Sequence, residues 1–289
     1  MIGCVAEPLI APEELADVLG EVILLDVRWQ LGRTDGREQF LAGHVPGAAF
    51  VDLEADLADS TGDGTHGRHP LPAPDRFAAA MRRCGVRRDS PVVVYDDASG
   101  AAATRAWWLL RDHGHPDVRL LDGGWSWWNR EGRPVETGED RNAEAGQFEA
   151  DHGHLPVLDP REAAVLATSG ALIDARAPER FRGESEPVDP VAGHIPGAVN
   201  VPVAQNLEPP SSRRAGRFKS RDALAQVYAG VGVLEGAGAV GAVGAYCGSG
   251  VTATQDLFAL HLLGVDAALF PGSWSAWVSD PTRPVAVGD

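Results

Sequence analysis

The chain contains the same series of segments twice. The matched pairs are VILLDVRW (22–29) with ALIDARAP (171–178), LAGHVPGAAFVDL (41–53) with VAGHIPGAVNVPV (191–203), and DGGWSWWNREGRPV (122–135) with FPGSWSAWVSDPTRPV (270–285). A repeat of this length predicts two halves with the same fold, because each copy carries its own complete set of elements. The distance from His44 to Asp97 equals that from His194 to Cys247. This spacing puts Asp97 where the second copy has Cys247.

Each copy has the pattern of an α/β domain. Short apolar runs such as VVVYDD (92–97) alternate with helical segments such as ATQDLFALHLLG (253–264). Strands that are apolar throughout and separated by helices indicate a parallel sheet covered on both faces. The sequence therefore predicts two tandem α/β domains, each a mainly parallel sheet flanked by helices. They span residues 1–138 and 156–289, with a Gly- and Glu-containing linker over 139–155.

The composition limits what the chain can bind. A net charge of −16 and a pI of about 4.9 argue against a nucleic-acid or anionic-membrane partner, whose phosphates would repel it. No stretch approaches the ~18 apolar residues of a membrane span, and the N-terminus lacks a secretory pattern. We expect a cytoplasmic protein.

The three cysteines show no pattern of a metal or disulfide site. Cys4, Cys84 and Cys247 lie far apart, without a CxxC pair or a Cys/His cluster. Free thiols suit a reducing compartment. The segment GAGAVG (236–241) matches a dinucleotide fingerprint, but it leads into a strand instead of opening a helix. We therefore expect neither a metal nor another cofactor.

The segment CGSGVT, which begins at Cys247, is the strongest candidate for chemistry. It lies between an apolar run and a helix expected to open near Thr252. Gly248 and Gly250 allow a tight turn in which successive N–H groups point at one atom, at the end of the helix that favours anions. A cysteine held there is expected to be a thiolate nucleophile, although a small buried structural residue fits the same pattern. The repeat favours the nucleophile, because the carboxylate of Asp97 in the first copy cannot attack as a soft nucleophile.

The paired GHVPGA and GHIPGA segments, the cysteine loop in the second half and the final WSAW together resemble the tandem-domain rhodaneses, a family of sulfurtransferases. The resemblance covers nearly the whole chain, and the CGSGVT loop is closest to 3-mercaptopyruvate sulfurtransferases. Thiosulfate-using rhodaneses carry basic residues in this loop. The resemblance implies a ping-pong reaction in which a small-molecule donor passes sulfur to Cys247. The resulting persulfide then passes it to cyanide or to a thiol such as thioredoxin or a small thiol.

The resemblance also implies further site residues. Arg180, in PERFRGE, matches the arginine that binds the donor's anionic group, and Arg182 is the neighbouring candidate; an ion pair of Arg180 with Glu179 or Glu184 is the alternative. The loop residues Gly248, Ser249, Gly250, Val251 and Thr252 would line the donor site, with Ser249 either bonding the substrate or capping the helix. His69, in GRHPLP, and Glu54 match first-half residues near the cleft. For His69 the alternative is an exposed loop position.

One position departs from the pattern of the resembled enzymes. Mercaptopyruvate-type members carry a second arginine in a segment like EPR, whereas this chain has Val188 in SEPVDP. Arg213 or Arg214 would have to supply that charge. One fewer cation predicts weaker binding of the donor.

Three other functions remain to be weighed against transfer from mercaptopyruvate. Thiosulfate:cyanide sulfur transfer uses the same nucleophile. A phosphatase on this fold needs Cys-x5-Arg, but Ala253 stands six positions after Cys247. A catalytically silent module that binds a sulfur carrier would have no need of Cys247.

Overall fold

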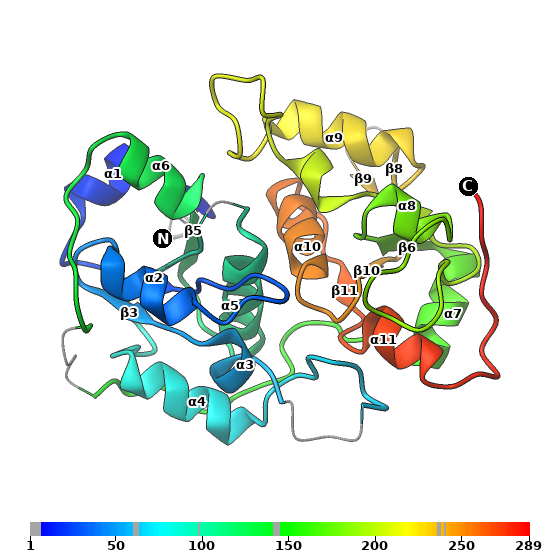
Figure 1. Ribbon diagram of the computed structural model, residues 1–289, viewed down its shortest axis with the longest axis horizontal. Helices are drawn as coiled ribbons and strands as arrows, with labels where there is room; N and C mark the ends of the chain where they lie inside the picture. The colour runs from blue at the N-terminus through cyan, green and yellow to red at the C-terminus, as the bar shows by residue number, and fades with distance from the viewer. Residues whose placement is uncertain (1–6, 60–63, 98, 141–144, 236–237, 240) are drawn as a thin grey trace. The chain divides into compact units, whose positions relative to one another are not determined.

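The computed structural model describes residues 7–59, 64–97, 99–140, 145–235, 238–239 and 241–289 (Figure 1). Cys4 and most of the GAGAVG segment lie outside them. The chain divides into two compact units, the first formed by Met1–Ala58 with Pro72–His154 and the second by Asp59–Leu71 with Leu155–Asp289. The predicted domain over 1–138 includes residues 59–71, whereas the structure groups them with the second unit.

The first unit is built on a five-stranded sheet. Its strands run in the order β1-β5-β4-β2-β3, and every pairing is parallel. The elements are β1 (Leu9–Ile10), α1 (Pro12–Asp17), β2 (Ile23–Asp26), α2 (Gly36–Ala42), β3 (Ala48–Phe50), α3 (Leu53–Asp56), α4 (Pro74–Arg83), β4 (Val92–Tyr95), α5 (Ala101–Asp112), β5 (Val118–Leu121) and α6 (Gly124–Arg130). Side chains of α1, α2 and α6 share one core with β2 and β4, while α5 packs against β4 and β5.

The second unit repeats this plan with a four-stranded parallel sheet in the order β11-β10-β6-β7. The elements are α7 (Pro160–Ser169), β6 (Ala171–Asp174), α8 (Pro178–Phe181), β7 (Val199–Asn200), the 3-10 helix η1 (Val203–Asn206), α9 (Arg221–Gly230), the antiparallel pair β8 (Leu234–Glu235) and β9 (Gly238–Ala239), β10 (Val243–Tyr246), α10 (Ala253–Leu262), β11 (Ala268–Leu269) and α11 (Ser273–Val278). Helices α7, α8 and α11 share a core with the sheet, and α10 packs on β10 and β11. The prediction of two α/β domains with parallel sheets is confirmed.

A buried arginine explains why the tryptophan segments recur. In the second unit, Arg176 bonds the carboxylate of Asp174 and the Gly193 carbonyl, and its guanidinium lies 4.6 Å from the Trp274 ring centre. In the first unit, Arg28 has the same partners at the corresponding positions, including Trp125 at 4.7 Å. The repeated GHxPGA and WS segments are therefore two parts of one packing unit around a cation.

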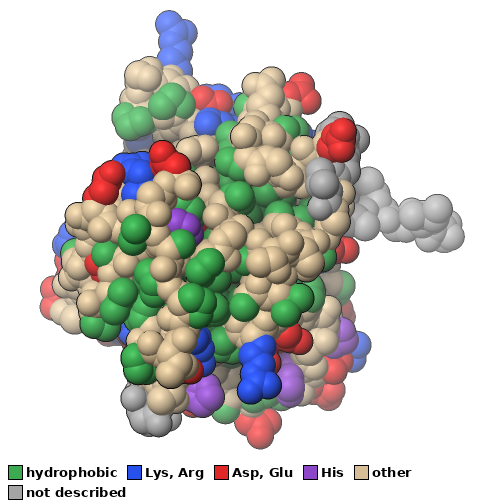
Figure 2. All heavy atoms as spheres, turned by 90° about the vertical axis from the view of Figure 1, so that its right-hand side faces the viewer, with side chains coloured by type: hydrophobic (Ala, Val, Ile, Leu, Met, Phe, Trp, Pro, Cys, Tyr) green, Lys and Arg blue, Asp and Glu red, His purple; other side chains and the backbone are tan. Residues whose placement is uncertain are grey.

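The surface drawn in Figure 2 has mixed character. Acidic and basic side chains are interspersed there with hydrophobic ones. Among the described side chains in that view, no extended basic area is seen.

No helix among the described residues is long and apolar enough to cross a membrane.

Candidate active site

The candidate nucleophile lies at the carboxyl end of a central strand, as sites in parallel sheets do. Cys247 directly follows β10 and is 1% exposed. The backbone N–H of Gly250 donates a hydrogen bond to Cys247 Sγ at 3.1 Å. Gly250 has a φ of +78°, and a Cβ there would collide with the Pro271 carbonyl. Only glycine allows this turn, which aims an N–H group at the sulfur just before α10 begins.

The segment before α11 holds the cysteine loop in place. Cys247 N–H donates to Ser273 Oγ at 3.1 Å, and Trp274 N–H donates to the Cys247 carbonyl at 3.0 Å. Ser273 has a φ of +53°, the one positive value among the described non-glycine residues. Such a conformation is unfavourable for a residue with a side chain, and here the serine hydroxyl bonds the backbone of the nucleophile. Ser273 was not predicted as a site residue, because nothing in PGSWSAW indicates its backbone conformation.

The register between the two copies differs from the sequence prediction. Trp125 N–H bonds the Asp96 carbonyl in the first unit, as Trp274 N–H bonds that of Cys247 in the second. Asp96, which directly follows β4, is therefore the counterpart of Cys247. The prediction that Asp97 takes this place is wrong.

The correction follows from a one-residue difference in length between the GHxPGA histidine and the end of the central strand. Tyr95 and Tyr246 end the matching strands, and each hydroxyl accepts an N–H from its GHxPGA segment. From these tyrosines to Gly100 and Gly250, which both have a φ of +78°, the first loop is one residue longer. From the histidine to the tyrosine the first copy is one residue shorter than the second, so an equal count from the histidines placed Asp97 one residue too far along the chain. Residue 98, inside the longer loop, is not among the described residues.

The Asp96 carboxylate takes the position of the sulfur in the first unit. It accepts the N–H of Gly100 at 2.8 Å and that of Ala102 at 3.0 Å, as Cys247 Sγ accepts that of Gly250. Both loops therefore direct backbone N–H groups at an atom that carries or can carry negative charge.

Arg180 lies beside the cysteine loop, but its partners differ from those expected. It bonds Glu186 through Nε at 3.0 Å and Nη2 at 2.6 Å, and its Nη2 lies 3.3 Å from Asp189 Oδ2. The expected alternative partners were Glu179 and Glu184. Glu186 also accepts the N–H of Val188. The turn that contains Val188, where the resembled enzymes have a second arginine, therefore binds the side chain of Arg180 through Glu186.

A second arginine reaches the same place from the 59–71 segment. Arg68 forms an ion pair with Asp189, and its Nη2 is 2.9 Å from the position that a Cβ on Gly248 would occupy. Nη2 of Arg180 is 3.6 Å from that position. Two guanidinium groups thus converge next to the nucleophile. Arg68 was not predicted as a site residue, although it precedes His69 in GRHPLP. Only the fold brings residue 68 next to residue 248.

Burial and ion pairing set the charges in this cluster. Burial acts to lower the pKa of Arg176, but the adjacent Asp174 carboxylate outweighs it and the pKa is raised. Burial also acts against ionisation of Glu186, yet the hydrogen bonds from Arg180 hold its pKa below the ordinary value. For Asp189 burial prevails over the Arg68 charge and raises the pKa. Asp189 is therefore the carboxylate of this cluster that is most easily neutralised.

Ser249 and His69 meet in the same unit. His69 Nδ1 lies 2.7 Å from Ser249 Oγ, and the imidazole is buried, at 4% exposure. The alternative interpretation of His69 as an exposed loop residue is wrong, because His69 is buried within the second unit. Val251 is buried behind the loop, and Thr252 is the residue before α10.

Four of the other candidates make their contacts elsewhere. Arg182 forms an exposed ion pair with Glu184. Glu54 belongs to the first unit, where it accepts the indole N–H of Trp29 at 2.9 Å. Arg213 and Arg214 lie in the turn that the Leu207–Phe218 bridge closes.

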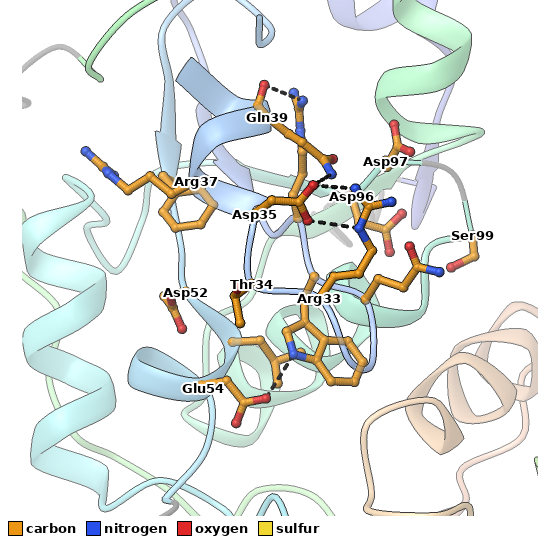
Figure 3. Close-up of a pocket in the computed structure, with 16 residues that line it drawn as sticks. Arg33, Thr34, Asp35, Arg37, Gln39, Asp52, Glu54, Asp96, Asp97 and Ser99 are labelled. Carbon is orange, nitrogen blue, oxygen red and sulfur yellow. Dashed lines mark hydrogen bonds and ion pairs between the residues drawn. The ribbon is translucent and has the colours of Figure 1, made fainter. Parts of the chain in front are cut away.

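The first unit has a cavity of about 460 Å³ at the position that corresponds to the Cys247 site of the second unit (Figure 3). Residues that follow β2 and β4 line it, among them Arg33, Asp96 and Gln39. Phe40 stacks on His44 as Phe181 stacks on His194, so Gln39 is the counterpart of Arg180. Its amide donates to Asp35, which also pairs with Arg33. Both the nucleophile and its arginine are therefore replaced in the first unit.

Comparison with known proteins agrees with this geometry. The rhodanese-like domain family matches the chain twice, over residues 11–131 and 159–280. The chain is 47% identical over 287 residues to SseB of Mycobacterium tuberculosis, which is provisionally named a thiosulfate sulfurtransferase; the match covers 97% of each chain. It is 44% identical over 288 residues to a Pseudomonas aeruginosa protein provisionally named a 3-mercaptopyruvate sulfurtransferase, covering 97% of this chain and 98% of that one.

A solved structure extends the comparison to three dimensions. SseA from Escherichia coli, described in a study of 3-mercaptopyruvate sulfurtransferases and their rhodanese fold, superposes with a TM-score of 0.79 at 33% identity. The match covers 93% of this chain and 99% of SseA.

Two domains of one fold, with a cysteine whose sulfur accepts a backbone N–H in the second and an aspartate in its place in the first, define a tandem-domain sulfurtransferase. The chain belongs to the rhodanese family.

Proposed function

We propose that this sulfurtransferase takes sulfur from 3-mercaptopyruvate onto Cys247 and delivers it to a thiol or to cyanide. The observation that carries the proposal is the sulfur of Cys247 in its N–H-lined loop, with Arg180 and Arg68 beside Gly248. A guanidinium holds a carboxylate well, and the neutral loop leaves room for a keto acid.

In the first half-reaction the Cys247 thiolate attacks the thiol sulfur of the donor. A sulfur–sulfur bond forms and the donor's carbon–sulfur bond breaks, so its electron pair leaves as the enolate of pyruvate. A proton then converts the enolate to pyruvate. The Ser249 hydroxyl, bonded to His69, is placed to relay that proton.

In the second half-reaction an acceptor thiolate, or cyanide, attacks the outer sulfur of the persulfide. The sulfur–sulfur bond to Cys247 breaks, and its electron pair returns to Cys247 as the thiolate. The N–H of Gly250 and the start of α10 favour the anion in both states.

We infer a small thiol or a thioredoxin-type protein as the acceptor, in a cytoplasmic setting. Cys84 and Cys247 are both free thiols, which persist under reducing conditions. A thiol-rich setting also supplies the acceptor for the second half-reaction.

Thiosulfate is the second candidate donor. The name of the M. tuberculosis relative favours it, as do the two arginines near the sulfur. Mercaptopyruvate remains the better candidate, because the carboxylates of Glu186 and Asp189 offset those arginines and leave little net charge for a dianion.

The proposal is tested by intact-protein mass spectrometry and by rates with both donors. Incubation with mercaptopyruvate without an acceptor should add one sulfur, about 32 Da, to Cys247, as expected of a covalent intermediate. Reductant should remove it, and kcat/KM should be higher for mercaptopyruvate than for thiosulfate. No adduct, or an adduct at Cys4 or Cys84, contradicts the persulfide mechanism. A preference for thiosulfate reassigns the donor.

A further inference from the structure

We propose that Arg68 is the second cation of the donor site and that Asp189, which bridges Arg68 and Arg180, restricts that site to donors with a single negative charge. The inference rests on the proposed transfer of sulfur through Cys247. Arg68, which is far from Val188 in the sequence, would then supply the positive charge that is missing at Val188.

The backbone around Arg68 is fixed to the second unit. Gly67 has a φ of +93°, and a Cβ on it would lie 2.5 Å from the Gly272 carbonyl oxygen. The N–H of Arg68 donates to Ser275 Oγ at 3.1 Å. Glycine therefore allows the 59–71 segment to lie directly on the start of α11, next to the residues that hold the cysteine loop.

The Arg68 side chain has capacity for a ligand. Its Nη1 pairs with Asp189, while its Nε is buried without a hydrogen-bond partner among the described residues. Its Nη2 points at the space beside Gly248, which Arg180 also borders. A carboxylate placed there can accept hydrogen bonds from both guanidinium groups.

Asp189 holds the two arginines together. Its side chain is 4% exposed, and its two oxygens face Arg68 and Arg180 separately. Such a bridge keeps both guanidinium groups in position before the donor arrives, so Asp189 is a positioning residue and not a catalytic one.

The charges of the whole cluster nearly cancel. The cations are Arg68, Arg176 and Arg180, and the anions are Asp174, Glu186 and Asp189. A monocarboxylate adds one negative charge to this set, whereas thiosulfate adds two beside an anionic sulfur. Because the cluster has no net positive charge, the second charge of the dianion makes its binding less favourable than that of a monocarboxylate, so the cluster favours the α-keto acid.

The first test is Asp189→Asn, which removes one negative charge and keeps the shape of the side chain. The ratio of kcat/KM for thiosulfate to that for mercaptopyruvate should rise about tenfold, mainly through KM for thiosulfate. Glu184→Gln is the matched control, because it makes the same chemical change in the same segment at an exposed site. An unchanged donor ratio in Asp189→Asn overturns the inference, and so does an equal rise in Glu184→Gln.

The second test concerns Arg68 itself. Arg68→Ala should raise KM for mercaptopyruvate about tenfold with a smaller change in kcat, because a charge-assisted hydrogen bond is lost. Arg68→Lys should recover part of this loss, since it restores the charge without the planar fork. A KM equal to that of the wild type in Arg68→Ala overturns the inference, and this variant decides alone should Asp189→Asn not fold.

Binding without turnover separates this inference from the proposed reaction. In a Cys247→Ser background, calorimetry with pyruvate measures the affinity of the anion site for a carboxylate directly. Weaker pyruvate binding on adding Arg68→Ala supports the inference even if the wild type forms no persulfide, which would contradict the reaction alone. Equal binding overturns the inference even if the persulfide forms.

Discussion

The loops after β4 and β10 are two versions of one structure with different chemistry. Each follows a tyrosine, turns at a glycine with a φ of +78° and leads into a helix. In the second unit an N–H group of the loop bonds the Cys247 sulfur, and in the first the N–H groups bond the Asp96 carboxylate. The fold therefore provides an anion-binding turn in both units, and the residue placed in it decides whether that turn can carry sulfur.

The two loops also differ in what their central residue contributes, which is stability of the loop in the first unit and reactivity in the second. The Asp96 carboxyl group accepts the N–H groups of its own loop, whereas Cys247 leaves its loop able to bind a transferred sulfur. The arginine at the site follows the same division, because Arg180 has Gln39 as its counterpart. The predictions below test this difference, from the largest effect to the smallest.

Cys247→Ser should lower sulfur transfer by more than about a thousandfold, because the nucleophile is removed from an intact site. The free energy of unfolding should change little, since serine keeps the size of the side chain. Rates with mercaptopyruvate and circular dichroism of the same sample check both parts. Activity within tenfold of the wild type would show that another group attacks the donor.

Arg180→Gln places the residue of the first unit in the second. The value of kcat/KM for mercaptopyruvate should fall about ten- to a hundredfold, as expected for the loss of a charge-assisted hydrogen bond. Gln39→Ala is the matched change in the first unit and should leave the rate unaltered. Similar losses in both variants would contradict the division of roles.

Asp96→Ala should destabilise the protein by about 1–3 kcal/mol, because it leaves buried N–H groups of the first loop without their acceptor. Urea unfolding monitored by fluorescence measures the loss. The rate per folded molecule should stay that of the wild type. A fall in rate without a fall in stability would show that the first loop takes part in the reaction.

Asp256 in α10 should make stability depend on pH. Burial raises its pKa to about 8 from 3.8, although Asn206 and Tyr228 bond it. The native state therefore holds a proton that the unfolded state releases, so the free energy of unfolding falls as pH rises from about 4 to about 8.

The counterpart of Asp256 in the first unit is Ala106, which cannot titrate, and Asp256→Asn should remove the dependence. Urea unfolding of both proteins at several pH values tests this. The variant should gain stability relative to the wild type as pH increases over that range. Parallel curves would show that the carboxyl group is ionised in the native protein.

Cys84→Ala should have the smallest effect. Cys84 is a buried thiol of the first unit, and burial raises its pKa to about 12, so it is not a thiolate at neutral pH. Sulfur transfer should be unchanged, with a loss of stability of about 1 kcal/mol. Mass spectrometry should find the added sulfur in this variant too. Its absence would move the persulfide to Cys84.

The sequence by itself determined the duplicated fold and pointed to Cys247 as the candidate nucleophile. The repeated segments carry their packing partners with them, since the Asp-x-Arg, GHxPGA and WS residues meet within each unit. Such local patterns are readable because the residues that must meet recur at the same spacing in both copies. Gly248 and Gly250 likewise predicted the tight turn after Cys247.

Only the tertiary structure decided the charges around the nucleophile and the true counterpart of Cys247. Arg68 is far from Gly248 in sequence, and Gly67 brings it there by a close backbone approach that has no sequence motif. Asp96 was identified as the counterpart of Cys247 through the hydrogen bonds that Trp125 and Trp274 donate to their carbonyls. Charge and geometry at a site depend on distances in space, and in a chain that crosses between units those distances are not set by separation along the sequence.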